Sequence, residues 1–147
     1  MADKSKRTKA REYAFQMMYR YGMTGETPTQ IPLTFWQPLG VVEPEVKDFA
    51  ESLFRGAAAK AADSDAVIEK FLKNGWTFER MGEIEKNIMR VALYELLDGK
   101  SPYFAVLDDF VTLTKKFGDE AAAGLVNGIL DNVRKTYSLS AGENEQG

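Results

Sequence analysis

Apolar residues recur every three to four positions through most of this 147-residue chain, which is the period of an amphipathic helix. In the first such stretch, residues 8–23, the apolar stripe consists of Ala10, Tyr13, Ala14, Met17, Met18 and Tyr21. The same spacing returns over residues 44–60, 63–73, 82–97, 101–117 and 119–135. No run alternates apolar and polar residues with β-branched enrichment, so no strand is predicted. We therefore expect a compact all-α bundle of about six to seven helices.

The segment between the first two helices, residues 24–44, shows no clean apolar period. It is punctuated by Pro28, Pro32, Pro38, Gly40 and Pro44. Such a sequence predicts a long connection with one short helical turn near residues 35–36. Residues 1–9 form a basic arm, and the polar residues 138–147 are typical of a disordered tail. Residues 1–137 are then a single domain.

The helix predicted over residues 82–97 is apolar most of the way round, which is typical of a central helix. Its expected core positions include Ile88, Val91, Ala92 and Leu96. In the last predicted helix, Asn127 and Gly128 keep the helical period although the pair resembles a turn. A glycine there is explained either by close helix packing or by a close backbone approach to a partner.

The chain contains no Cys and no His, which excludes disulfides, thiolate nucleophiles and the usual general base near pH 7. Asp108 and Asp109 are adjacent, but neighbours on a helix point about 100° apart and do not share a site. No phosphate-binding glycine loop is present. We expect a binding protein rather than an enzyme, with no metal, no cofactor and no small-molecule substrate.

No stretch of the sequence is long and apolar enough for a transmembrane helix, and no apolar segment of a secretory signal follows the charged start. These features predict a cytoplasmic protein with no membrane partner.

Charge is distributed unevenly, since residues 1–20 carry a net +4 and the remainder a net −7. A basic arm on an acidic body suggests an anionic partner at one end, with a solvated, mobile terminus as the alternative. On the helix that follows, Phe15 and Tyr19 lie off the apolar stripe, and Tyr19 aligns with Glu12 and Gln16. Exposed aromatics beside cations fit a surface for RNA or a protein partner, unless the 24–44 connection folds over them.

Five segments of the sequence, with their order and intervals, resemble the NusB family of transcription antitermination factors over about residues 6–135. They are Ala10-Arg11-Glu12 with Gln16 and Tyr19, the segment from Glu85 to Leu96, Pro102 with Ala105 to Asp109, Lys116-Phe117-Gly118, and Val126-Asn127-Gly128-Ile129-Leu130-Asp131.

The resemblance implies a bundle of two helical subdomains that binds the boxA sequence of nascent, single-stranded RNA. It also implies a small-subunit ribosomal protein, NusE, as partner, and assembly with transcribing RNA polymerase during ribosomal RNA synthesis. The RNA-binding candidates are Lys6, Arg7, Lys9, Arg11 and Gln16. The candidates for binding the protein partner are Tyr19, Glu85 and Leu125.

The sequence departs from the family pattern before the Val-Asn-Gly segment, where Ala121, Gly124 and Leu125 replace the usual Asp, Lys and Phe. Asp108-Asp109 replaces the usual Asn-Glu. Two alternatives therefore stay open. One is a protein-interaction or dimerising helical domain with weak or no RNA binding. The other is an accessory domain for a separate RNA cytosine methyltransferase, because NusB-like domains also occur fused to such enzymes.

Overall fold

The computed structural model describes residues 4–73, 75–98 and 101–137, and within them every regular element is a helix. The α-helices are α1 (Lys4–Thr24), α2 (Gln30–Phe35), α3 (Pro44–Ala59), α4 (Ala61–Phe71), α5 (Glu83–Asp98), α6 (Tyr103–Phe117) and α7 (Glu120–Thr136). Two short 3₁₀ turns, η1 (Gln37–Leu39) and η2 (Phe78–Arg80), lie between them. This confirms the predicted all-α fold. The predicted tail, residues 138–147, lies outside the described residues.

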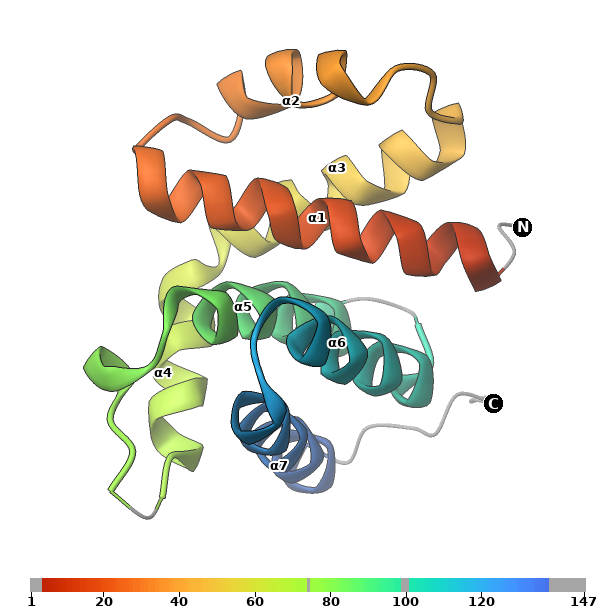
Figure 1. Ribbon diagram of the computed structural model, residues 1–147. Coiled ribbons are helices and arrows are strands. Elements are labelled where there is room, and N and C mark those ends of the chain that lie inside the picture. The colour runs from red at the N-terminus through yellow and green to blue at the C-terminus, as the bar shows by residue number, and fades with distance from the viewer. Residues whose placement is uncertain (1–3, 74, 99–100, 138–147) are drawn as a thin grey trace.

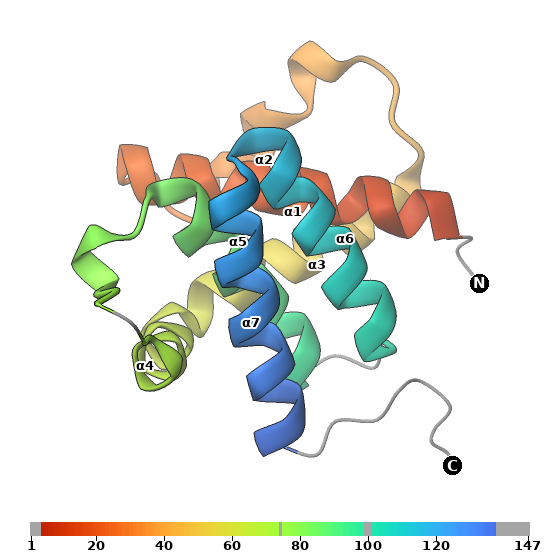
Figure 2. The ribbon, with the colours of Figure 1, turned by 60° about the horizontal axis from the view of Figure 1, so that its bottom comes forward.

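The helices form two groups, with α1, α2 and α3 in one and α4 to α7 in the other (Figure 1). Helix α5 packs against α1 and α3 on one side and against α4, α6 and α7 on the other. A second view shows α6 and α7 side by side, with α1 crossing behind them (Figure 2). The two groups correspond to the two helical subdomains that we expected.

Helix α5 owes its central place to apolar residues around most of its circumference. Ile88, Val91 and Ala92 are completely buried, and Leu96 is nearly so, which confirms the predicted core positions. Both groups of helices cover these side chains, so α5 lies at the centre of the core. None of the helices in the described part of the chain is long and apolar enough to cross a membrane.

Two boundaries differ from those predicted. Helix α1 already begins at Lys4, so the described part of the basic arm forms the first turns of a helix. The connection 24–44 contains a true helix, α2, where we expected a single turn. Phe35 and Trp36 pack edge-on against Tyr13 of α1, with ring centroids 6.0 and 5.2 Å away. These aromatic contacts hold the connection on α1.

The last helix begins and continues as its sequence predicts. Asp119 caps α7 by accepting a 2.8 Å hydrogen bond from the backbone N–H of Ala122. Asn127 and Gly128 lie within α7, as expected. Gly128 is exposed, however, and a Cβ there would meet no atom of the described residues within 4 Å. Close packing among the described residues therefore does not explain the glycine.

Candidate nucleic-acid and protein interface

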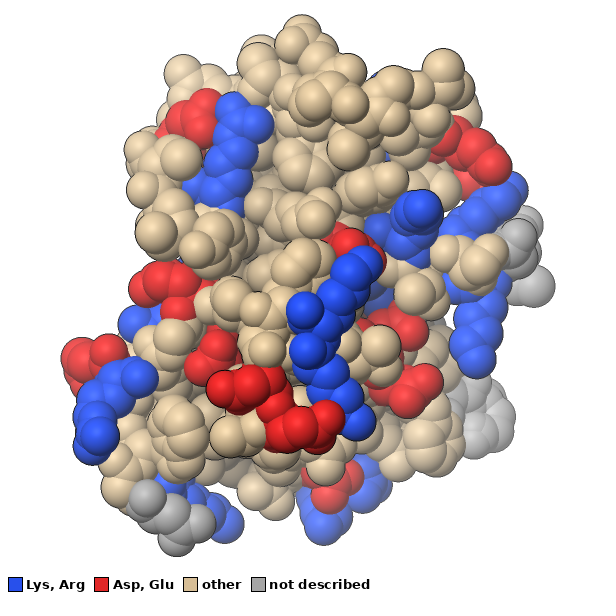
Figure 3. Space-filling view, viewed as in Figure 1, with Lys and Arg blue, Asp and Glu red and all other residues tan. Residues whose placement is uncertain are grey.

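The basic side chains of the first turns of α1 lie at the end of the molecule where this helix begins (Figure 3). Lys4 and Lys9 are exposed and have no ion-pair partner among the described residues. The guanidinium of Arg7 lies over the ring of Phe49 on α3, 5.0 Å from its centroid. Both lysines and one face of Arg7 are thus placed where they can meet an anion.

Lys6 lies three residues before Lys9, and both line a hollow beside the start of α3. Its Nζ lies 2.9 Å from a carboxylate oxygen of Glu43 and 2.7 Å from one of Glu45. The hydrogen bonds with Glu45 and Glu43 raise the pKa of Lys6. Because these partners are largely exposed, the ion pairs add little stability, but a phosphate would have to compete with two carboxylates for Lys6.

Arg11 contradicts its assignment to the RNA surface, because its side chain is only 2% exposed. Its Nε and Nη2 donate hydrogen bonds of 2.8 and 2.6 Å to the two carboxylate oxygens of Glu95. Its Nη1 donates a third, of 2.8 Å, to Asp109. Burial by itself lowers the pKa of Arg11, but these bonds raise it further than burial lowers it. The structure therefore assigns Arg11 to an internal ion-pair cluster.

The Arg11 cluster ties α1 to both α5 and α6. Thr8 donates a 2.9 Å hydrogen bond to the same Asp109 oxygen, and Ser101 donates one of 2.6 Å to Glu95. A buried charge of this kind is tolerated only when it is paired and hydrogen-bonded. The cluster therefore fixes the position of the basic turns on the bundle.

Tyr19 and Glu85 lie near a close approach between the end of α1 and the start of α5. A Cβ on Gly22, three residues after Tyr19, would lie 3.3 Å from the side chain of Asn87, two residues after Glu85. Glu85 is half-buried, and its carboxylate accepts a 3.2 Å hydrogen bond from the backbone N–H of Gly82, as in a capping box. Two of the three candidates for the protein partner thus come from elements that meet here.

The expectation that Phe15 is exposed is wrong. Phe15 is buried between Tyr19 and Phe117 of α6, with ring centroids 6.2 and 5.2 Å away. Helix α6 covers it, whereas the 24–44 connection covers Tyr13 instead. Tyr19 itself is half-buried, and Gln16, one turn before it, is half-buried as well.

Leu125, the third candidate for the protein partner, lies on α7 and lines a hollow that contains neither Tyr19 nor Glu85. This shallow hollow of about 250 Å³ lies between α7 and the segment that follows α4. The hollow is also lined by Gly124 and Gly128 on one side and by the exposed indole of Trp76 on the other.

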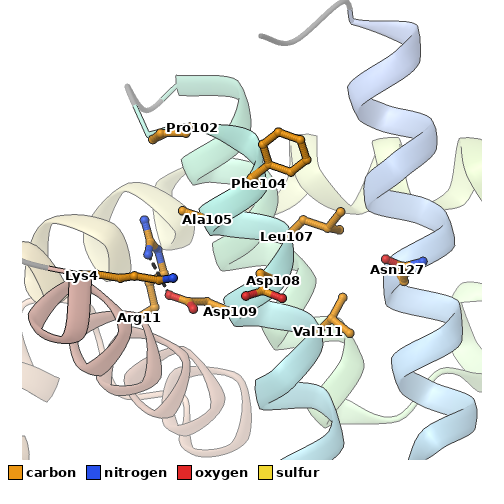
Figure 4. Close-up of a pocket in the computed structure, with 10 residues that line it drawn as sticks. All are labelled: Lys4, Arg11, Pro102, Phe104, Ala105, Leu107, Asp108, Asp109, Val111 and Asn127. Atoms are coloured by element: carbon orange, nitrogen blue, oxygen red, sulfur yellow. Dashed lines mark hydrogen bonds and ion pairs between the residues drawn. The ribbon is translucent and has the colours of Figure 1, made fainter. Parts of the chain in front are cut away.

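A groove that no sequence pattern indicated lies over α6 between α1 and α7 (Figure 4). It measures about 620 Å³. Lys4 and Arg11 border it on α1, Asn127 borders it on α7, and Phe104 and Asp108 come from α6. Asp109 turns toward Arg11, so the adjacent carboxylates do separate, as predicted from helix geometry.

Comparison with known proteins gives a consistent result. Residues 8–135 match the family model described as the NusB family. The transcription antitermination protein NusB of Anaeromyxobacter dehalogenans (strain 2CP-1) is 38% identical over 129 residues, which cover 88% of this chain and 90% of the relative. The protein of the same name from Aquifex aeolicus (strain VF5) is 35% identical over 136 residues, 91% of this chain and 90% of that one.

A crystal structure of antitermination factors NusB and NusE in complex with double-stranded RNA contains a chain with a similar fold. The TM-score is 0.83 at 31% sequence identity, and the match covers 90% of this chain and 98% of that one.

Proposed function

This chain belongs to the NusB family, and we propose that it is a transcription antitermination factor that binds boxA-type nascent RNA together with the ribosomal protein NusE. The proposal is supported by identity of 38% to a transcription antitermination protein over most of both chains. It is also supported by the similar fold of a chain from a NusB–NusE complex with RNA. We propose that the complex joins transcribing RNA polymerase during ribosomal RNA synthesis.

The observation that carries the proposal is the placement of two unlike surfaces along the single helix α1. Lys9 lies near its start and Tyr19 near its end, ten residues apart, which is about 15 Å along a helix axis. The first surface offers cations, and the second offers an aromatic side chain with a carboxylate from α5 nearby. One rigid element can thus hold RNA and protein side by side, which raises the effective concentration of one partner near the other.

Positioning of this kind needs no chemistry on either partner, and we propose that the protein acts without catalysis. We assign phosphate contacts to Arg7 and Lys9, with Lys6 joining when phosphates displace Glu43 and Glu45. Gln16 is proposed to contact RNA farther along α1. We assign NusE contacts to Tyr19, Glu85 and Leu125.

Fluorescence anisotropy with labelled boxA-type RNA tests the function. We expect the chain to bind the single strand, and to bind more tightly when purified NusE is present. A double-stranded RNA of equal length should be titrated in parallel, because the similar complex holds RNA of that form. If neither RNA binds with or without NusE, the antitermination function is contradicted and the chain is a protein-interaction domain.

A further inference from the structure

The groove over α6 contains polar side chains that the fold itself does not use. Asp108 is exposed and has no hydrogen-bond or ion-pair partner among the described residues, and the same holds for Asn127. Asn127 projects from α7 toward α6, across the groove from Asp108 (Figure 4). The neighbouring Asp109 is already satisfied by Thr8 and Arg11. Two unsatisfied groups that accept and donate hydrogen bonds therefore line one depression.

The same groove carries an exposed aromatic ring. Phe104 projects from α6 toward α7 and is 58% exposed, so a flat group can reach it from solvent (Figure 4). It already stacks on Tyr103, with ring centroids 4.5 Å apart and planes inclined by 26°. The guanidinium of Arg134 lies over Tyr103, 4.7 Å from its centroid. A base can extend this stack, because every nucleobase has a flat π-face.

The charge of the groove disfavours a phosphate at Asp108. Arg11 supplies one positive charge to two carboxylates, on Glu95 and Asp109, so that cluster keeps one net negative charge beside the carboxylate of Asp108 and the ammonium group of Lys4. A phosphate at Asp108 would therefore be repelled. A nucleobase carries no charge, while the phosphates on either side of it can lie near Lys4 and the other cations of α1.

We propose that this groove receives one unpaired nucleobase of the bound RNA, and that it selects a base with an exocyclic amino group. The ring of Phe104 stacks on the base, the carboxylate of Asp108 accepts from the amino group, and the amide of Asn127 bonds the neighbouring edge atom. Cytosine, adenine and guanine carry such an amino group, whereas uracil has only a ring N–H to donate, and the two carbonyls beside it repel a carboxylate. This inference rests on the proposed RNA-binding function and adds a specificity-determining site to it.

The test uses the full chain and three single-stranded RNAs: oligouridine of twelve nucleotides, and the same strand with one central cytidine or one central adenosine. Because the rest of each strand is uniform, its register can slide until the single different base occupies the groove. We expect the chain to bind the cytidine or adenosine strand roughly five- to 150-fold more tightly than oligouridine. All three strands carry the same number of phosphates, so non-specific attraction cancels from this ratio.

Three variants separate the groups. Asp108→Asn supplies a donor that uracil can accept, so the ratio should fall toward one. Phe104→Leu keeps an apolar side chain without a flat face, so binding of all three strands should weaken. Asp48→Asn is the matched control, because it removes one exposed carboxylate from α3 and should leave the ratio unchanged. Phe104 and Asp108 are exposed, so their variants should fold normally.

The outcomes are distinct. If the strands bind with normal salt dependence but show equal affinities in the wild type, the groove selects no base and this inference is overturned, while RNA binding stands. Retention of the wild-type ratio in Asp108→Asn overturns it as well. If Phe104→Leu changes only the sedimentation coefficient of the protein, the groove is a contact between copies of this chain. If no strand binds under any condition, the inference and the proposed RNA-binding function fail together.

Discussion

Arg11 of α1 and Glu95 of α5 form a bidentate ion pair, with hydrogen bonds of 2.8 and 2.6 Å, inside a core from which water is almost excluded. The pair joins residues 84 positions apart in the sequence. Arg11 belongs by sequence to the basic segment at the start of α1. In the structure, its ion pair holds that segment against the core.

Replacing Arg11 by Ala should lower the free energy of unfolding by about 3–5 kcal/mol, because it leaves Glu95 buried without its counter-charge. Urea denaturation measures this loss. Lys9→Ala, an exposed change two residues away, should stay within about 0.5 kcal/mol of the wild type. Equal stabilities of the two variants would contradict the structural role of Arg11.

The double variant Arg7→Ala, Lys9→Ala should weaken RNA binding for every sequence, because phosphate contacts position RNA without reading it. For single-stranded RNA the slope of log K against log salt is about −0.7 per neutralised phosphate, so two lost contacts should flatten it by about 1.4. Binding titrations at several salt concentrations measure the slope. Lys60→Ala, which removes a cation from the junction of α3 and α4, is the control and should leave the slope unchanged.

Glu85→Lys should weaken binding of NusE, and Tyr19→Ala should weaken it further in the double variant. A charge at the rim of an interface mainly affects association rate and salt dependence, whereas a desolvated pair costs about 2–5 kcal/mol when one partner is truncated. Surface plasmon resonance separates the two cases by showing whether the association or the dissociation rate changes. Glu85→Gln keeps the hydrogen bond to Gly82 without the charge and shows how much of the loss is electrostatic. Undiminished binding by the double variant would remove this face from the interface.

Gly124→Ala should stabilise the protein by up to about 1 kcal/mol, because Gly124 lies inside α7 and a Cβ there meets only open space among the described residues. Gly56→Ala is the opposite case in α3, where the added Cβ would overlap the ring of Tyr94 and should destabilise the fold. Gly124→Lys should also tighten RNA binding if α7 faces the RNA. Thermal unfolding and RNA titration measure the two effects separately.

Acid should weaken the junction between α1 and α2. The hydrogen bond from Arg20 lowers the pKa of Glu26 from 4.5 to about 2. A carboxyl group whose pKa is lower in the folded state stabilises fully above its unfolded pKa, and its contribution is lost as pH falls through the folded pKa. Melting temperatures measured between pH 5 and pH 2 should therefore fall less steeply for Glu26→Gln than for the wild type. Arg20→Gln should likewise make the melting temperature fall less steeply between pH 5 and pH 2. If both variants show the wild-type dependence on pH, the pairing of Arg20 with Glu26 is contradicted.

The helical framework could be predicted because its signal is local. The apolar period of α5 marks Ile88 and Leu96 as core residues, and Asp119 marks the start of α7. Helix α2 was harder to predict because prolines interrupt its sequence and its place depends on aromatic contacts with Tyr13.

The candidate site was less predictable because its side chains find partners far away in the sequence. Arg11 lies three and four residues before the buried Ala14 and Phe15, so it shares their face of α1. Glu95 lies on the apolar face of α5, and a carboxylate there needs a buried counter-charge. Together these positions signal an internal ion pair. The groove over α6 arises from the packing of three helices, which no single stretch of sequence encodes.

The ion pairs that join α1 to α5 and α6 also determine when α1 reaches its final position during synthesis. Helix α1 leaves the ribosome before α2 to α7, and Glu95 and Asp109, which bind Arg11, are made 84 and 98 residues after it. Until they emerge, the guanidinium lacks both of these counter-charges, and α1 is covered by α2 and α3 without the complete α5 and α6. Contacts so distant in sequence form late, since a long loop must close before they gain energy. The cationic end of the molecule therefore takes its final orientation only when α6 has been added, so unfinished chains lack the complete cationic surface.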